Sequence, residues 1–96
     1  MVVFSFRKFG ENLGTRPLGQ KVREQLMPLL EKDERVVLDF TGVNVVSNSF
    51  ADECIAKLLL TMSLDELKAH TTFRGLNPVA AESVLTALQR RHLAMA

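Results

Sequence analysis

Residues 35–53 read RVVLDFTGVNVVSNSFADE, and this stretch decides the fold. It begins with a short, apolar run rich in β-branched residues, Arg35 to Phe40, which predicts a buried strand. A turn and a polar segment follow, and apolar residues at helical spacing then predict a helix from about Phe50 to Met62. Ser49 is the predicted N-cap of this helix, because Asp52 stands three residues later. The chain is therefore expected to pass from a strand into a helix through a short polar connection.

The N-terminal third predicts a strand, a loop and a helix. Val2 to Phe6 alternates between two faces, which is typical of a strand. Gly10 to Thr15 is a loop, and the sequence leaves open whether it holds a short second strand. Thr15 is expected to cap the next helix, with Pro17 in its first turn. A turn over residues 31–34 then leads to the central strand.

The C-terminal third repeats the alternation of helix and strand. Ser63 and Glu66 have the spacing of a capping box, which predicts a short helix over Leu64 to Ala69. Thr71 to Leu76 is expected to form a strand. Asn77-Pro78 is a strong helix start, and the apolar stripe predicted for the last helix is Val79, Ala80, Val84, Leu85 and Leu88.

Three strands that alternate with helices predict an α/β domain with a mostly parallel sheet of three to five strands. The strands divide into an apolar face and a half-polar face, whereas a sheet covered on both sides would be apolar throughout. We therefore expect a single two-layer domain over residues 1–96, with helices on one face only. The residues expected to be almost fully buried are Leu38, Phe40, Ile55, Leu58 and Phe73.

Composition excludes several classes of function. The chain has 96 residues and a net charge of +1, so no general positive field attracts nucleic acid or anionic lipid. No apolar run approaches the ~18 residues of a membrane span. Cys54 is the only cysteine, which rules out an internal disulfide and fits a reducing compartment. We expect a cytoplasmic protein with no nucleic-acid or membrane partner.

The sequence carries no familiar catalytic, cofactor or metal motif. The glycine-rich phosphate loops, HExxH and CxxC are all missing, so we expect no enzyme, no cofactor and no bound metal. His70 and His92 stand alone and are interpreted as surface residues. Cys54 lies on the apolar stripe of its predicted helix and is interpreted as a core thiol rather than a nucleophile.

Asp39 is the residue on which an enzymatic alternative depends. Aspartates at strand ends carry phosphoryl transfer in some α/β folds, so a small phosphoryl-transfer or hydrolytic enzyme centred on Asp39 stays an alternative. Such sites add further carboxylates, and no DxD pattern follows here. The favoured interpretation is structural: Asp39 accepts hydrogen bonds from the Thr41-Gly42 turn or pairs with Arg74.

The predicted strand-to-helix connection is the best candidate for a docking surface. It lies where the strand ends, the edge at which ligands and partners bind in open α/β sheets. On an ideal helix, Glu53, Ala56 and Leu60 point away from the sheet, so Ala56 and Leu60 would form an exposed strip. The partner-binding residues predicted within the docking segment 47–60 are Ser47, Asn48, Ser49, Asp52, Glu53, Ala56 and Leu60.

The open sheet face offers another role. Val3 and Val37 are apolar residues on the side that helices are expected to leave bare. They could support a homodimer, so an oligomerisation unit is a further alternative. They could equally be covered by the loop Arg7 to Gly14.

The run VVLDFTGVNVVSNSFADE, Val36 to Glu53, resembles the segment shared by STAS domains, the anti-sigma factor antagonists and their relatives. It is more similar to the STAS-like family of unknown function, in which the helix opens with a Ser-Phe-Ala-Asp-like run. Gly14-Thr15-Arg16 and the passage from Thr72-Phe73 to Asn77-Pro78 also resemble that family. The resemblance implies a small, mostly parallel sheet with helices on one face. It also implies a regulatory module whose partner is an anti-sigma factor or an ATPase-type kinase.

The resemblance implies a switch, and this sequence departs from the switch motif. In the antagonists a serine at the helix start is phosphorylated within Asp-Ser-Ser-Gly. Here Asn48 occupies the position of the usual acceptor, and an asparagine cannot take a phosphate. Ser49 matches the second serine and is the candidate phosphorylation site, while Phe50 replaces the glycine.

Overall fold

A three-stranded parallel sheet forms one layer of the molecule. The computed structural model describes residues 1–32 and 35–94. Strand β3 (Val36–Asp39) lies in the middle, between β1 (Val2–Ser5) and β5 (Thr71–Arg74). Every strand runs in the same direction, as the helical crossovers predict.

A second, smaller parallel ladder joins the connections that follow β1 and β3. It pairs β2 (Asn12–Leu13) with β4 (Val45–Val46). The loop from Gly10 to Thr15 therefore does hold a short second strand, β2, which the sequence alone could not decide. A 3-10 turn, η1 (Phe6–Phe9), lies between β1 and β2, so the first strand ends one residue earlier than predicted.

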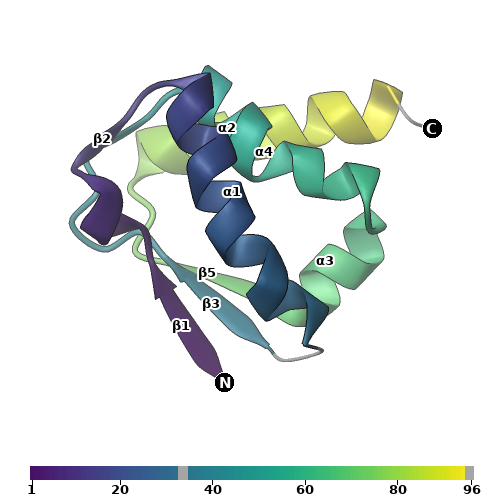
Figure 1. The fold of residues 1–96 in the computed structure, drawn as a ribbon. Coiled ribbons are helices and arrows are strands. Elements are labelled where there is room, and N and C mark those ends of the chain that lie inside the picture. Colours follow the sequence, from purple (N-terminus) through teal and green to yellow (C-terminus); the bar gives the residue numbers. More distant parts are fainter. Residues whose placement is uncertain (33–34, 95–96) are drawn as a thin grey trace.

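The helices form the other layer. Figure 1 shows all of the labelled α-helices on one side of the sheet, which confirms the two-layer α/β architecture. Helix α2 lies between α1 and α4 and contacts both. The α-helices are α1 (Arg16–Glu31), α2 (Asn48–Cys54), α3 (Leu64–His70) and α4 (Pro78–Ala94).

Helices α1, α3 and α4 begin at the predicted caps. Thr15 Oγ1 accepts a hydrogen bond from the Leu18 N–H at 3.2 Å. Ser63 and Glu66 form a complete capping box. Asn77 Oδ1 accepts from the Ala80 N–H at 2.8 Å. Helix α1 continues through Pro28 to its end, and the turn predicted over residues 31–34 lies partly outside the described residues.

Most of the predicted core is confirmed. Leu38, Phe40, Ile55 and Leu58 are buried, but Phe73 is only partly buried because β5 is an edge strand. The stripe predicted for α4 is partly wrong, since Val79 and Leu85 are exposed. Three residues of the predicted stripe, Ala80, Val84 and Leu88, are buried, and Ala87 completes the buried face of α4 at helical spacing.

The open face of the sheet is more closed than predicted. Val3, on the edge strand β1, is 50% exposed, whereas Val37 is only 5% exposed. Val37 lies on the middle strand, with Val3 and Thr72 beside it in register. Arg35 also crosses this face, since its guanidinium donates a hydrogen bond to Thr72 Oγ1.

Candidate functional site

Helix α2 begins two residues earlier than predicted, and its N-cap is Ser47. The Ser47 hydroxyl accepts a hydrogen bond from the Phe50 N–H at 3.0 Å and donates one to the Gly14 carbonyl at 3.0 Å. The prediction that Ser49 is the cap is wrong. Strand β4 ends at Val46, so Ser47 is the first residue with extended backbone after the ladder, and Ser49 already lies within the helix.

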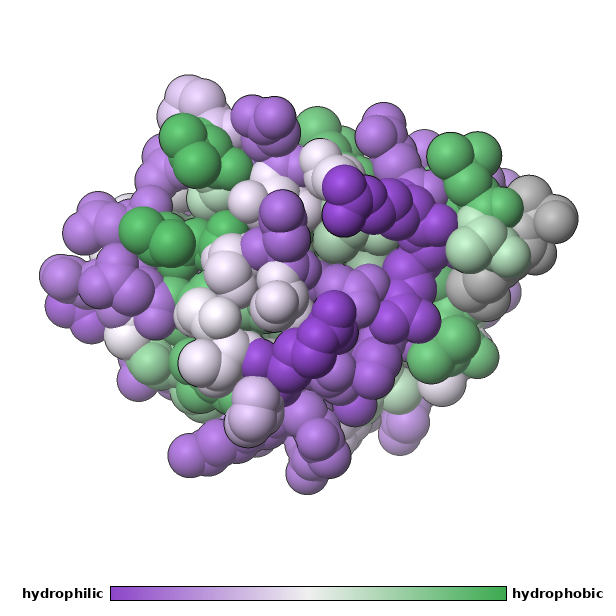
Figure 2. Space-filling view, turned by 90° about the horizontal axis from the view of Figure 1, so that it is seen from above, coloured by the Kyte–Doolittle hydropathy of each residue, from purple (hydrophilic) through white to green (hydrophobic). Residues whose placement is uncertain are grey.

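The exposed start of α2 borders a hollow between α1, α2 and α4. Asn48 is exposed and Ser49 is half-buried. The hollow has a volume of about 360 Å³. Figure 2 looks onto this end of the molecule, where strongly hydrophilic side chains lie beside a group of paler residues. The lining residues are Arg16, Asn48, Ser49, Asp52, Thr86, Ala87 and Arg90.

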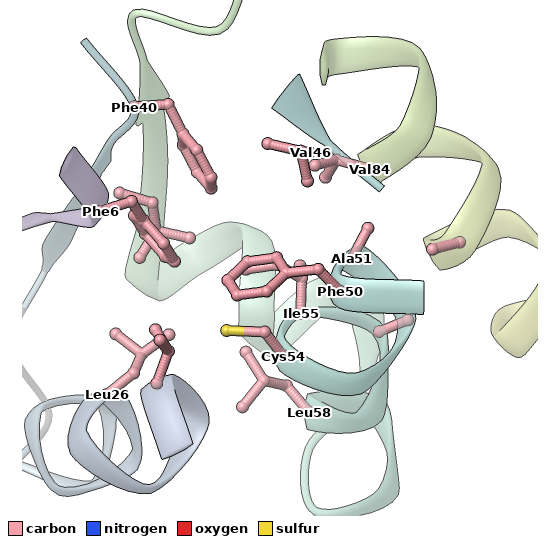
Figure 3. Packing of buried hydrophobic residues seen from close by; sticks show 14 of the residues in the cluster. Phe6, Leu26, Phe40, Val46, Phe50, Ala51, Cys54, Ile55, Leu58 and Val84 are labelled. Atoms are coloured by element: carbon pink, nitrogen blue, oxygen red, sulfur yellow. The ribbon is translucent and has the colours of Figure 1, made fainter. Parts of the chain in front are cut away.

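A core of aromatic and aliphatic side chains packs against the buried side of α2. Phe50 is fully buried and meets the ring of Phe6 edge-on, at 6.5 Å between centroids. Phe6 in turn stacks on Phe40, the residue that follows β3, at 4.0 Å between ring centroids. Figure 3 shows Phe50 and Cys54 pointing from α2 into this core, towards Phe6 and Leu26. The residue that replaces the glycine of the antagonist motif therefore anchors α2 to the sheet.

Cys54 is a core thiol, as predicted. Its side chain is fully buried, and burial raises the pKa of the thiol to about 12. A thiol in this state is a poor nucleophile at neutral pH.

The exposed strip predicted from Ala56 to Leu60 does not form. Helix α2 ends at Cys54, and the chain continues as a 3-10 turn, η2 (Ala56–Leu60). The 3-10 geometry changes which side chains share a face, and α4 packs against this turn. Ala56 is fully buried, which contradicts its predicted place on the docking surface. Leu60 is 60% exposed, as predicted.

Asp52 connects α2 to both neighbouring helices. Its Oδ1 accepts a hydrogen bond from Arg91 Nε at 2.7 Å, and its Oδ2 accepts from Arg91 Nη2 and Arg16 Nη1, each at 2.8 Å. Hydrogen bonding to Arg91, with Arg16 adding to it, lowers the pKa of Asp52 to about 2. Asp52 is therefore ionised and fully paired rather than available to a partner.

Glu53 is buried, although the sequence places it on the outer face of the helix. Its carboxylate forms ion pairs with Arg23 of α1 at 2.7 Å and with Lys57 at 2.9 Å. Arg16 lies 3.5 Å away, and Arg23 Nη1 also donates to the Glu53 carbonyl. Burial opposes ionisation of Glu53, but the hydrogen bonds from Arg23 and Lys57 outweigh it, so the pKa is lowered. The predicted contact of Glu53 with a partner is wrong because α1 already covers it.

Leu60 lies apart from the start of α2. It borders a separate hollow of about 280 Å³, together with Arg23, Met27, Lys57 and Thr61. The seven predicted docking residues therefore do not form one surface. Asn48 and Ser49 line the first hollow, Ser47 precedes them and is half-buried, and Leu60 lies next to α1.

The structural interpretation of Asp39 is confirmed. Its Oδ1 accepts hydrogen bonds from the Thr41 N–H at 3.0 Å and the Thr41 hydroxyl at 2.6 Å. Its Oδ2 accepts from Arg74 at 3.1 Å. The Thr41 bonds lower the pKa of Asp39 to about 2, with Arg74 adding to the effect.

Sequence reasoning missed the cations that surround α2. Arg16, Arg23 and Arg91 are 30 to 39 residues away from the carboxylates they bind. Their only sequence signal is indirect: adjacent acidic residues in a helix that must lie between two others require cationic partners. Thr86 and Arg90 of α4, which line the first hollow, carry no signal of that kind.

Other chemistry is limited within the described part of the chain. No group of three metal-ligating side chains occurs in residues 1–32 and 35–94. His92 is exposed and His70 is half-buried. None of the helices in these segments is long and apolar enough to cross a bilayer.

Comparison with known families gives one match. The family described as a STAS-like domain of unknown function (DUF4325) matches residues 19–80, which is more than half of the chain. No curated protein and no solved structure matches. The matched segment holds β3, β5 and all of α2, whereas Arg16, Thr86 and Arg90, which also line the hollow, lie outside it. The chain therefore belongs to the STAS-like domain family of unknown function.

Proposed function

We propose that this chain is a non-catalytic regulatory module that binds a partner protein at the exposed start of α2. The proposal rests on the contrast between exposed and fixed side chains at the start of α2. Asn48 is exposed at the surface, whereas Phe50, Asp52 and Glu53 are fixed by the core and by ion pairs. A rigid base that presents a few polar groups is suited to specific binding, because little order is lost on association.

The partner class follows from the resemblance to anti-sigma factor antagonists. Their partners are an anti-sigma factor or an ATPase-type kinase, and we carry that class over to this chain as a proposal. We also expect the protein to act in the cytoplasm. The surface proposed for contact is Ser47, Asn48 and Ser49, with the neighbouring rim of α4. Leu60 stays a separate, secondary contact.

Ser49 is the proposed phosphorylation site of the switch. A phosphoserine carries a charge of about −1.5 to −2 at pH 7. Sequence alone predicts that Asp52 and Glu53 oppose this charge, but both carboxylates are already neutralised by arginines and a lysine. Ser49 instead borders a hollow that contains Arg16 and Arg90. A phosphate there would be tolerated by the fold and would change the surface that a partner meets.

The test is capture of the partner from the native host by tagged variants of the chain. Asn48→Arg and Ser49→Asp should each reduce capture of the same protein by about tenfold or more. Gln25→Arg is a matched control, because it also changes an exposed amide on a helix to arginine. Circular dichroism verifies that each variant folds. Equal capture by all variants would mean that α2 is not the docking element, and phosphopeptide mass spectrometry tests Ser49 separately.

Self-association through the open sheet face is the second candidate function. It is favoured by Val3, which is half exposed on β1, an edge strand of the sheet. Exposed apolar side chains on an edge strand can pair with another copy of the chain. The buried state of Val37 reduces the apolar area available for it.

A further inference from the structure

The hollow between α1, α2 and α4 contains hydrogen-bond donors that have no acceptor. Within residues 1–32 and 35–94, the side chains of Asn48, Ser49, Thr86 and Arg90 make no hydrogen bond or ion pair with one another or with other residues. Arg16 donates to carboxylates only through Nη1, so its Nε and Nη2 groups are also available. Side chains from three helices therefore bring unpaired hydrogen-bond donors together in one hollow.

The charge of this hollow favours an anion. Asp52 is the one acidic residue that lines it, and both of its oxygens are already occupied by Arg16 and Arg91. Arg90 has no such partner among the described residues, so its positive charge faces the hollow uncompensated. An adjoining hollow shares Asn48, Thr86 and Arg90 and adds Glu82, which opposes an anion from the far side.

The size of the space indicates more than a bare ion. The first hollow measures about 360 Å³ and the adjoining one about 430 Å³. Spaces of this order hold small organic ligands. The adjoining hollow adds Val79 and Ser83, which suit a short carbon chain with hydroxyl groups.

We propose that this hollow binds a small phosphate monoester. The planar guanidinium groups of Arg90 and Arg16 match the geometry of phosphate oxygens, and the hydroxyls of Ser49 and Thr86 complete the hydrogen bonds. The ester group lies towards Ser83. The inference goes beyond partner binding and does not need a partner. A phosphate attached to Ser49 would supply the same chemistry from within the chain, so the test separates the two sources.

The experiment titrates the unphosphorylated chain with glycerol 3-phosphate and, separately, with inorganic phosphate, at ionic strength held constant with sodium chloride. Nitrogen-15 NMR should show saturable shifts at Asn48, Ser49, Thr86 and the Arg90 Nε. Loss of the Arg90 guanidinium in Arg90→Gln should weaken binding about tenfold to hundredfold. Glu82→Gln should strengthen it by about two- to fivefold, because it removes an opposing exposed charge.

Two further arms make the result decisive. Arg35→Gln is the matched control: Arg35 directly precedes β3, donates to Thr72 and the Ala69 carbonyl, and lines neither hollow, so its loss should leave the affinity unchanged. A chain with phosphoserine at position 49 should lose binding of the free monoester, because both phosphates need Arg90. The proposal is overturned by shifts that do not saturate, by an Arg90→Gln affinity equal to wild type, or by unchanged binding to the phosphoserine chain. Failure to capture a protein partner would not affect this titration.

Discussion

Gly19 of α1 is buried directly against α2. A Cβ built on Gly19 would lie 2.9 Å from Glu53 Cβ and 3.2 Å from the Phe50 carbonyl oxygen. Gly19→Ala should therefore separate the two helices and lower the free energy of unfolding by about 1–2 kcal/mol. This value sets the cost of overpacking against the better helix propensity of alanine. Denaturant unfolding measures it.

Gly14→Ala is the control for this substitution. No atom lies within 4 Å of a Cβ at Gly14, so its free energy of unfolding should change by less than about 0.5 kcal/mol. If Gly19→Ala is as stable as Gly14→Ala, α1 does not pack closely on α2.

Asp52 should make stability depend on pH in the acid range. Its pKa in the folded chain is about 2, below the ordinary value of 3.8. The stabilisation is therefore fully present above about pH 4 to 5 and is lost as the pH falls towards 2. Asp52→Asn should cost about 1–2 kcal/mol at pH 7, with solvent screening allowed for, and should flatten the slope of unfolding free energy between about pH 5 and 2.

The matched control for the acid titration is Asp65→Asn, which removes an exposed carboxylate in the first turn of α3. It should keep most of the wild-type slope. A wild-type slope in Asp52→Asn would show that the bonds to Arg91 and Arg16 do not persist in solution.

At the scale of the element, the start of α2 distinguishes two serines. Ser47→Ala removes the cap and the bond to Gly14, and should lower the free energy of unfolding by about 0.5–2 kcal/mol. Ser49→Ala should be neutral or slightly stabilising, since alanine is the better helix former inside α2. Thermal unfolding of the two variants measures the difference. A larger loss of stability in Ser49→Ala than in Ser47→Ala would show that Ser49 is the cap.

Helix α2 also shows where sequence reasoning stops. Local rules place Thr15, Ser63 and Asn77 correctly as caps, because a cap depends on residues three positions apart. The rule selects Ser49 because of Asp52, but the observed cap is Ser47, and the position of the cap depends on where β4 ends. That end is set by pairing with β2, more than thirty residues earlier in the chain.

At the scale of the whole molecule, the two layers and the parallel sheet could be predicted, because hydrophobic periodicity reports which face of each element is buried. The helices and arginines that surround α2 could not be predicted from the sequence. Periodicity assigns an outer face to Glu53 and Ala56, yet α1 and α4 cover both flanks of the helix. Which helices neighbour one another is a property of the topology, and the arginines that pair with Asp52 and Glu53 follow from it.

The open sheet face predicts weak self-association at most. Val3 is exposed, but Val37, its partner on β3, is buried. Of this pair, only Val3 offers apolar surface to another copy of the chain. We expect sedimentation velocity to show a monomer at micromolar concentration and Val3→Asp to change nothing. A dimer that Val3→Asp dissociates would instead make oligomerisation the leading function.

The central claim is that a partner protein contacts the exposed start of α2. Photo-crosslinking in the native host tests it most directly, because the reactive side chain captures whichever protein touches it. A photoreactive p-benzoylphenylalanine is placed at position 48, at position 25 on α1 or at position 72 on the open sheet face, all of which are exposed. The account predicts a discrete crosslinked protein from position 48 and none from positions 25 and 72. A crosslink from position 25 or 72, with none from position 48, would contradict it.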